Sequence, residues 1–214
     1  MTPEAHRHLR RRCPVMRRLI RKHGPCTLAP EIGRPPFESL VRAVAHQQLN
    51  STAAESILRR FRALFPSRRF PTARQLAAVN DDALRAAGFS WAKIAALRDI
   101  AAKTLDGTVP TSRAIATMPD HEIIERLVQV RGVGRWTVEM LLIFKLGRPD
   151  ILPVDDFGVR NGFRIAFGLL ELPKPKELLA HGERWRPFAT TAAWYLWRAA
   201  DAAKDQRGIK GVNA

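Results

Sequence analysis

The spacing of apolar residues predicts an all-α fold for this chain of 214 residues. Apolar side chains recur every three or four positions along most of the sequence, which places them on one face of a helix. The strict alternation of apolar and polar residues that marks a half-buried strand is absent. With 46% hydrophobic residues, the chain can bury one large core or two smaller domains that share a core.

Helices are expected on both sides of a Pro- and Gly-rich linker at residues 24–36. Before the linker, Val15, Leu19 and Ile20 form an apolar stripe. After it, the apolar residues of 37–45 follow the i, i+3, i+4, i+7 pattern of a buried helix face. Capping boxes predict two further helix starts, Thr52 with Glu55 and Thr72 with Gln75.

The second half of the chain shows helix ends and a second loop. Gly88 and Gly107 stand where helices should stop, because a residue after a helix often adopts positive φ. A loop is expected at residues 147–153. Pro187 suits the start of a helix, and residues 188–203 are then expected to form the last long helix. We therefore expect two helical lobes, one of residues 36–147 and one that joins residues 1–35 to 148–214.

The charge of the chain indicates a polyanionic partner. The net charge is +16 and the pI about 11.3, a balance typical of nucleic-acid binding but shared by ribosomal and membrane-surface proteins. No apolar run reaches the roughly 20 residues that span a bilayer, so we expect a cytoplasmic, nucleoid-associated protein and no membrane partner. The basic N-terminal stretch, with Glu4 as its one carboxylate before residue 23, leaves an organelle transit peptide open as the alternative.

The cysteines exclude the common multi-thiolate metal centres. Only Cys13 and Cys26 occur, which is too few for a tetrahedral zinc site or a four-thiolate iron–sulfur cluster. A reduced pair is favoured, although a disulfide between them stays open.

The strongest local motif is Leu-Val-Gln-Val-Arg-Gly-Val-Gly-Arg-Trp-Thr at residues 127–137. Gly132 and Gly134 permit a tight turn with positive φ between two helices. The second helix then presents unpaired N–H groups at its N-terminus, which together with the helix dipole suit a phosphate. Arg131 and Arg135 add positive charge. This arrangement predicts a sequence-independent grip on DNA, whereas an ordinary helical hairpin with two glycines is the alternative.

Three motifs in order carry a resemblance to a known family. They are residues 45–50 (Ala-His-Gln-Gln-Leu-Asn), the hairpin of residues 127–137, and residues 151–157 (Ile-Leu-Pro-Val-Asp-Asp-Phe). From about residue 35 to 197 the chain resembles the helix-hairpin-helix DNA glycosylases of the 3-methyladenine DNA glycosylase II type. The resemblance implies two helical lobes flanking a DNA-binding cleft, no β domain, and a monomer that acts on damaged double-stranded DNA.

The resemblance also implies roles for single residues. The family's catalytic residue corresponds to Asp156, and the lysine nucleophile of its bifunctional members is replaced here by Trp136, which implies base removal without lyase activity. The family's iron–sulfur cysteines are missing from the C-terminal part of the chain. The other implied sites are the base pocket of Trp136 and Trp197, the wedge at Gln48 with Leu49 as neighbour, the phosphate grip of Gly132, Gly134, Arg135 and Thr137, and a monovalent cation on the carbonyls of Val128, Val130 and Val133.

The chemistry fits a single carboxylate. Hydrolysis of an N-glycosidic bond develops positive charge on the sugar, which a carboxylate near C1′ stabilises while it orients or deprotonates water. Bases such as N3-methyladenine and N7-methylguanine are already cationic and leave with little acid assistance. We assign Asp155 to the N-cap of the following helix; the alternative is that both aspartates are caps. Glycosylases for ethenoadenine, hypoxanthine or oxidised bases, and a non-catalytic DNA-binding protein, remain competing hypotheses.

Overall fold

The computed structural model describes residues 2–66 and 70–212, and it confirms the all-α prediction: over these ranges the chain forms helices, turns and loops without any strand. The chain divides into two compact units. The terminal unit joins Met1–Glu31 to Leu142–Ala214, and the middle unit is Ile32–Leu141. The boundaries thus fall at 31/32 and 141/142 rather than at the expected 35/36 and 147/148.

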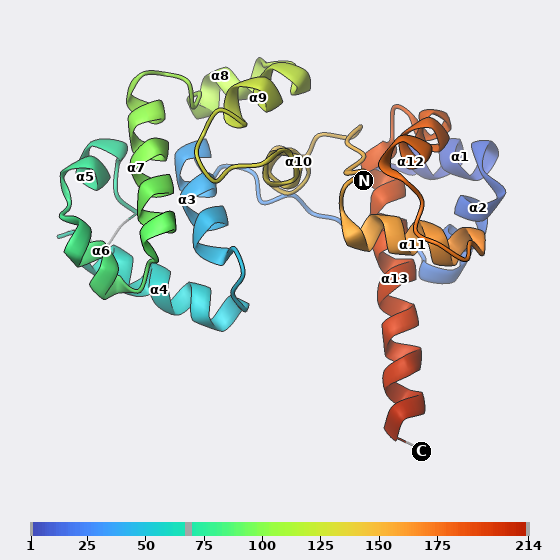
Figure 1. The fold of residues 1–214 in the computed structure, drawn as a ribbon. Coiled ribbons are helices and arrows are strands. Elements are labelled where there is room, and N and C mark those ends of the chain that lie inside the picture. The colour runs from blue at the N-terminus through green and yellow to red at the C-terminus, as the bar shows by residue number, and fades with distance from the viewer. Residues whose placement is uncertain (1, 67–69, 213–214) are drawn as a thin grey trace. The chain divides into compact units, whose positions relative to one another are not determined.

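The middle unit is built around α7 (Figure 1). This helix packs against α3, α5 and α6, and α4 packs against α3 and α6. The buried face of α7 carries Ile94, Leu97 and Ile100, each at most 2% exposed. The helices of this unit are α3 (Pro36–His46), α4 (Ser51–Ala63), α5 (Ala73–Ala78), α6 (Asp81–Ala87), α7 (Trp91–Leu105), α8 (Ser112–Thr117), α9 (Asp120–Leu127) and most of α10 (Arg135–Phe144).

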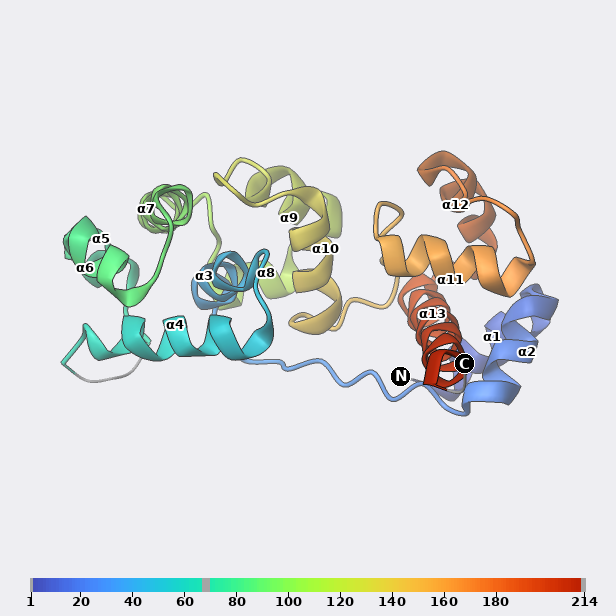
Figure 2. The same ribbon diagram turned by 60° about the horizontal axis from the view of Figure 1, so that its bottom comes forward.

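The terminal unit is built around α13, against which α11 and α2 pack (Figures 1 and 2). The N-terminal helices contribute Leu9, Met16 and Ile20 to the core that also buries Trp185 and Tyr195. The stretch before residue 23 is therefore an integral part of this unit. The helices are α1 (Pro3–Arg12), α2 (Pro14–His23), α11 (Phe157–Phe167), α12 (Pro175–Gly182), the short 3₁₀ helix η1 (Glu183–Trp185) and α13 (Ala189–Val212).

The helix starts test the predicted caps. The capping box of Thr72 and Gln75 is confirmed, with both reciprocal bonds formed. The one predicted at Thr52 is wrong, because the N-cap of α4 lies two residues earlier, at Asn50, whose side chain accepts from the N–H of Ala53 at 2.9 Å. Glu55 instead pairs with His46, at 3.1 Å.

The two cysteines are free thiols buried in the terminal unit. Burial raises the pKa of the Cys26 thiol above its ordinary value. Across residues 2–66 and 70–212, every helix is too short or too polar to cross a membrane.

Candidate active site and DNA-binding elements

The hairpin between α9 and α10 has the geometry that its glycines predicted. Gly132 takes φ +77°, and the N–H of Val133 donates to the carbonyl of Val130 at 3.0 Å to close the turn. A Cβ on Gly132 would lie 3.1 Å from the Cβ of Ala96 on α7. The turn therefore requires glycine twice, once for its backbone angle and once for its close approach to α7.

The N-terminus of α10 presents backbone donors. The first helical bond that reaches back to the hairpin runs from the N–H of Val138 to the carbonyl of Gly134 at 3.2 Å. The N–H groups of Arg135 and Thr137 precede it in the first turn of α10, where backbone N–H groups have no acceptor within the helix. No acidic residue lies in this turn, so the positive end of the helix dipole keeps its attraction for an anion. Arg135 and Trp136 are exposed there, Trp136 by 48%.

The loop after α3 holds the predicted wedge residues on the surface. Gln48 adopts φ +57°, an unusual angle for a residue other than glycine, and Leu49 is 40% exposed. The side chain of Gln47 donates to the carbonyl of Gly132 at 2.8 Å. The loop and the hairpin, which lie 85 residues apart in the chain, are therefore in direct contact.

The carboxylate of Asp156 is fixed by two donors. Its Oδ1 accepts from the N–H of Val159 at 2.7 Å and from the indole Nε1 of Trp197 at 2.8 Å. Asp156 is half-buried, and its extended backbone makes it the N-cap of α11. The assignment of the cap to Asp155 is thus wrong: α11 begins at Phe157, which leaves Asp155 exposed and one residue too early to cap it.

Two glycines allow Trp197 to reach this carboxylate. A Cβ on Gly158 would lie 2.9 Å from Cδ1 of Trp197, and one on Gly162 would lie 1.9 Å from the backbone oxygen of Leu196. Helices α11 and α13 can pack this closely only because both positions lack a side chain. The indole of Trp197 also stacks on Phe144, with ring centroids 5.7 Å apart.

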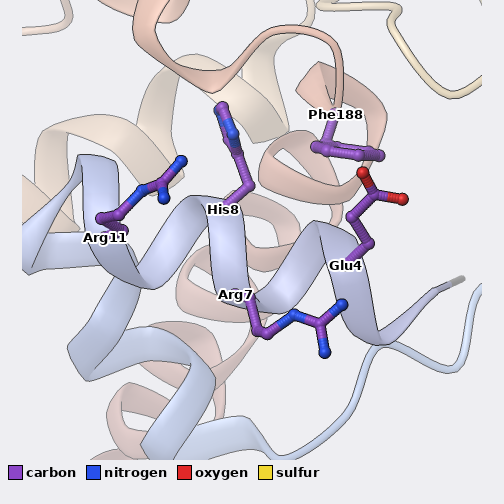
Figure 3. Close-up of a pocket in the computed structure, with 5 residues that line it drawn as sticks. All are labelled: Glu4, Arg7, His8, Arg11 and Phe188. Atoms are coloured by element: carbon purple, nitrogen blue, oxygen red, sulfur yellow. The ribbon is translucent and has the colours of Figure 1, made fainter.

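Three further aromatic side chains of the terminal unit, those of Trp185, Trp194 and Phe188, make other contacts. Trp185 and Trp194 are buried in the core of the terminal unit, with exposures of 0% and 8%. Phe188 meets the ring of His8 at 5.4 Å and lines a surface cavity of about 420 Å³ (Figure 3). Its other lining residues come from α1: Glu4, Arg7, His8 and Arg11.

The comparisons with known proteins identify the family. The model for HhH-GPD superfamily base excision DNA repair proteins matches residues 41–187. The chain belongs to this superfamily. The chain is 45% identical over 177 residues to DNA-3-methyladenine glycosylase 1 of Schizosaccharomyces pombe, covering 83% of this chain and 78% of that protein. It is 28% identical over 171 residues to DNA-3-methyladenine glycosylase 2 of Escherichia coli, covering 75% and 56%.

Solved structures agree with this membership. A 3-methyladenine DNA glycosylase of Schizosaccharomyces pombe in complex with abasic DNA matches with a TM-score of 0.80 and 41% identity, over 91% of this chain and 95% of that one. A DNA-3-methyladenine glycosidase of Bacillus halodurans matches with a TM-score of 0.85 and 32% identity, over 95% and 92%. The predicted resemblance and the predicted enzyme class, a DNA glycosylase of base excision repair, are therefore confirmed.

Proposed function

We propose that this glycosylase excises alkylated bases, 3-methyladenine and 7-methylguanine among them, with Asp156 as its catalytic carboxylate. The observation that carries the proposal is the pair of donors on Oδ1 of Asp156, which fixes the carboxylate at the start of α11. The names of the relatives support the substrate class.

The geometry suits electrostatic catalysis. The N–H of Val159 and the indole of Trp197 hold one oxygen of the carboxylate in place, so little reorganisation is needed when charge develops. Asp156 also lies at the N-terminus of α11, the end of a helix that attracts negative charge. An ionised Asp156 beside C1′ of an extruded nucleotide would stabilise the oxocarbenium-like sugar and orient or deprotonate the attacking water. A cationic alkylated base then departs without a second acid.

The residue at position 136 supports base release without strand cleavage. Bifunctional glycosylases need an amine nucleophile, and the second hairpin helix carries Trp136 at that place instead. We assign Trp136 and Trp197 to the base pocket, where their rings would attract an electron-poor base. Because Trp197 also donates to Asp156, it would join base recognition to the catalytic carboxylate.

The middle unit would supply the binding elements. Gly132, Gly134, Arg135 and Thr137 form the proposed phosphate grip, and Gln48 with Leu49 the wedge that fills the gap left by the flipped base. The carbonyls of Val128, Val130 and Val133 stay a proposed site for a monovalent cation, since oxygen donors are what such an ion prefers. Among the described residues, no group of three or more His, Cys, Asp or Glu side chains is placed to hold a metal ion. We further propose that the protein acts as a monomer in the cytoplasm.

The test is base release from a panel of lesion duplexes by the wild type, Asp156→Asn and Asp155→Asn. Asparagine caps a helix as well as aspartate does and its Oδ1 can still accept from Val159 and Trp197, so the variant loses the charge without losing the fold. We expect Asp156→Asn to slow single-turnover release of 3-methyladenine by at least about 100-fold. Binding to abasic duplex should persist, and Asp155→Asn, the matched control, should keep the wild-type rate.

Other outcomes would select among the alternatives. Unchanged release by Asp156→Asn would refute the catalytic assignment. Activity confined to ethenoadenine, hypoxanthine or neutral oxidised bases would replace the substrate class and keep the site. Salt-sensitive binding without base release from any lesion would leave a DNA-binding protein only.

A further inference from the structure

One face of α7 meets both DNA-binding elements of the middle unit. Lys93, Ala96 and Asp99 are spaced three residues apart, and so share one side of the helix. Lys93 contacts the loop after α3, Ala96 contacts Gly132, and Asp99 contacts the backbone of Arg131. Each contact joins segments that are more than 30 residues apart in the chain.

Lys93 holds the loop through backbone oxygens. Its ammonium group donates to the carbonyls of Ala45 and of Gln47, both at 2.9 Å. These carbonyls end α3, where a cation is favoured by the helix dipole. Burial lowers the pKa of Lys93, and two of the three donors of its ammonium group bind the loop.

The loop needs such support because of Gln48. A left-handed backbone is unfavourable for a residue other than glycine, so it persists only where its neighbours fix it. Here the residue before Gln48 is fixed twice, by Lys93 at its carbonyl and by Gly132 at its side chain. Gln48 and Leu49 are thereby left exposed in one defined conformation.

Asp99 holds the hairpin from the same helix face. Its carboxylate accepts from the N–H of Arg131 at 2.7 Å, the residue that precedes the left-handed Gly132. Ala96 lies between the two polar contacts and is small enough for Gly132 to approach. The spacing between the loop and the hairpin is therefore set by α7 as well as by the bond from Gln47 to Gly132.

We propose that Lys93 and Asp99 are positioning residues which set the wedge loop of residues 47–49 at a fixed distance from the phosphate-binding hairpin. The proposal rests on the proposed function in one respect, the assignment of this loop as the wedge. With the spacing fixed before DNA arrives, the ordering of the loop need not be achieved during binding. Discrimination of a base gap from intact duplex then depends on α7, although α7 itself carries no proposed DNA contact.

The experiment measures wedge insertion without base release. The probe is a duplex with a tetrahydrofuran abasic-site analogue opposite 2-aminopurine, whose fluorescence rises when it is unstacked; an undamaged duplex of the same sequence is the reference. The analogue has no base to remove, so a failed glycosylase assay leaves this result intact. The variants are Lys93→Met, which keeps the length and loses the donors, Lys93→Arg as the conservative rescue, and Lys103→Met as the matched control on the same helix.

We expect Lys93→Met to lose at least half of the fluorescence rise and to bind the analogue duplex about 5–10-fold more weakly, with affinity for undamaged duplex changed by less than twofold. Lys93→Arg should restore most of the rise, and Lys103→Met should match the wild type. Wild-type fluorescence and selectivity in Lys93→Met would overturn the proposal, as would equal losses for both duplexes, which would indicate a purely structural role. If Lys93→Met does not fold, the same criteria apply to Asp99→Ala, which removes the acceptor for the N–H of Arg131.

Discussion

The two units hold their functional groups by opposite means. In the terminal unit, the absence of side chains at Gly158 and Gly162 lets α11 and α13 pack until Trp197 reaches Asp156. In the middle unit, the charged side chains of Lys93 and Asp99 reach out to hold backbone segments. In the proposed function the carboxylate of Asp156 must sit beside one atom, and close packing fixes it. The proposed phosphate grip needs backbone amides at a set spacing, and the polar side chains of α7 would fix that spacing.

The sharpest test of this contrast replaces one glycine of each unit with alanine. In Gly162→Ala the new Cβ would lie 1.9 Å from the backbone oxygen of Leu196, so the two helices must separate. We expect a loss of about 3 kcal/mol in the free energy of unfolding of the terminal unit. In Gly132→Ala, with φ +77° and a side-chain neighbour at 3.1 Å, we expect about 1 kcal/mol. Peptide-resolved hydrogen exchange would measure each unit separately.

Activity should separate the same two variants. Gly162→Ala should slow base release because Trp197 moves away from Asp156, whereas Gly132→Ala should mainly weaken DNA affinity. Equal stability losses, or a Gly132→Ala protein with normal affinity, would show that the two units do not differ in the way their packing suggests.

The bond between Trp197 and Asp156 contrasts with the core contacts of Trp194 on the same helix. Trp197→Phe keeps a six-membered aromatic ring beside Phe144 and removes the indole donor together with its five-membered ring. Because a hydrogen bond to a charged group is worth about 1.5–3 kcal/mol, we expect single-turnover base release to slow by about 10- to 150-fold. The control is Trp194→Phe, a core position that faces Tyr195 and Arg198.

The Trp194→Phe protein should lose stability and keep its rate of base release. The Trp197→Phe protein should mainly lose rate. A wild-type rate in Trp197→Phe would mean that the N–H of Val159 suffices to orient the carboxylate. The helix N-terminus alone would then explain the site.

The features of the molecule that depend on neighbouring residues could be predicted from the sequence. The hairpin glycines, the capping box of Thr72 and the helical core positions depend on residues within a few places of one another, so spacing alone predicts them. The choice between Asp155 and Asp156 as N-cap needed a helix start accurate to one residue, which apolar spacing does not provide.

Long-range contacts were beyond such patterns. Asp156 meets Trp197 across 41 residues, and Lys93 meets Gln47 across 46. Only the glycines four residues apart at 158 and 162, on one face of α11, carried a usable signal: within a helix, such a pair indicates close approach of another helix. The partner, α13, becomes evident only from the tertiary structure.

The smallest expected effect is a dependence of stability on pH that arises in the terminal unit. Burial is the largest cause that lowers the pKa of His6, His23 and His181, all in the terminal unit. In the unfolded chain these imidazoles become protonated as the pH falls below their ordinary pKa of 6.5. In the folded chain the same imidazoles stay neutral down to a lower pH. The unfolded state then binds more protons, so stability falls as pH decreases from about 6.5 through the folded pKa values, with no contribution above that window.

His181 offers the variant for this test. Its Nε2 is buried and has no hydrogen-bond partner among the residues that the structure describes, and its ring lies edge-on to Phe163, Phe167 and Trp185. His181→Phe fits these aromatic neighbours and cannot titrate, so the drop in Tm between pH 7 and pH 5 should shrink by about 1–2 °C. His121→Phe, an exposed position in the middle unit, should leave the drop unchanged. If His181→Phe has the wild-type pH dependence, acid does not act on the terminal unit through this half-buried ring.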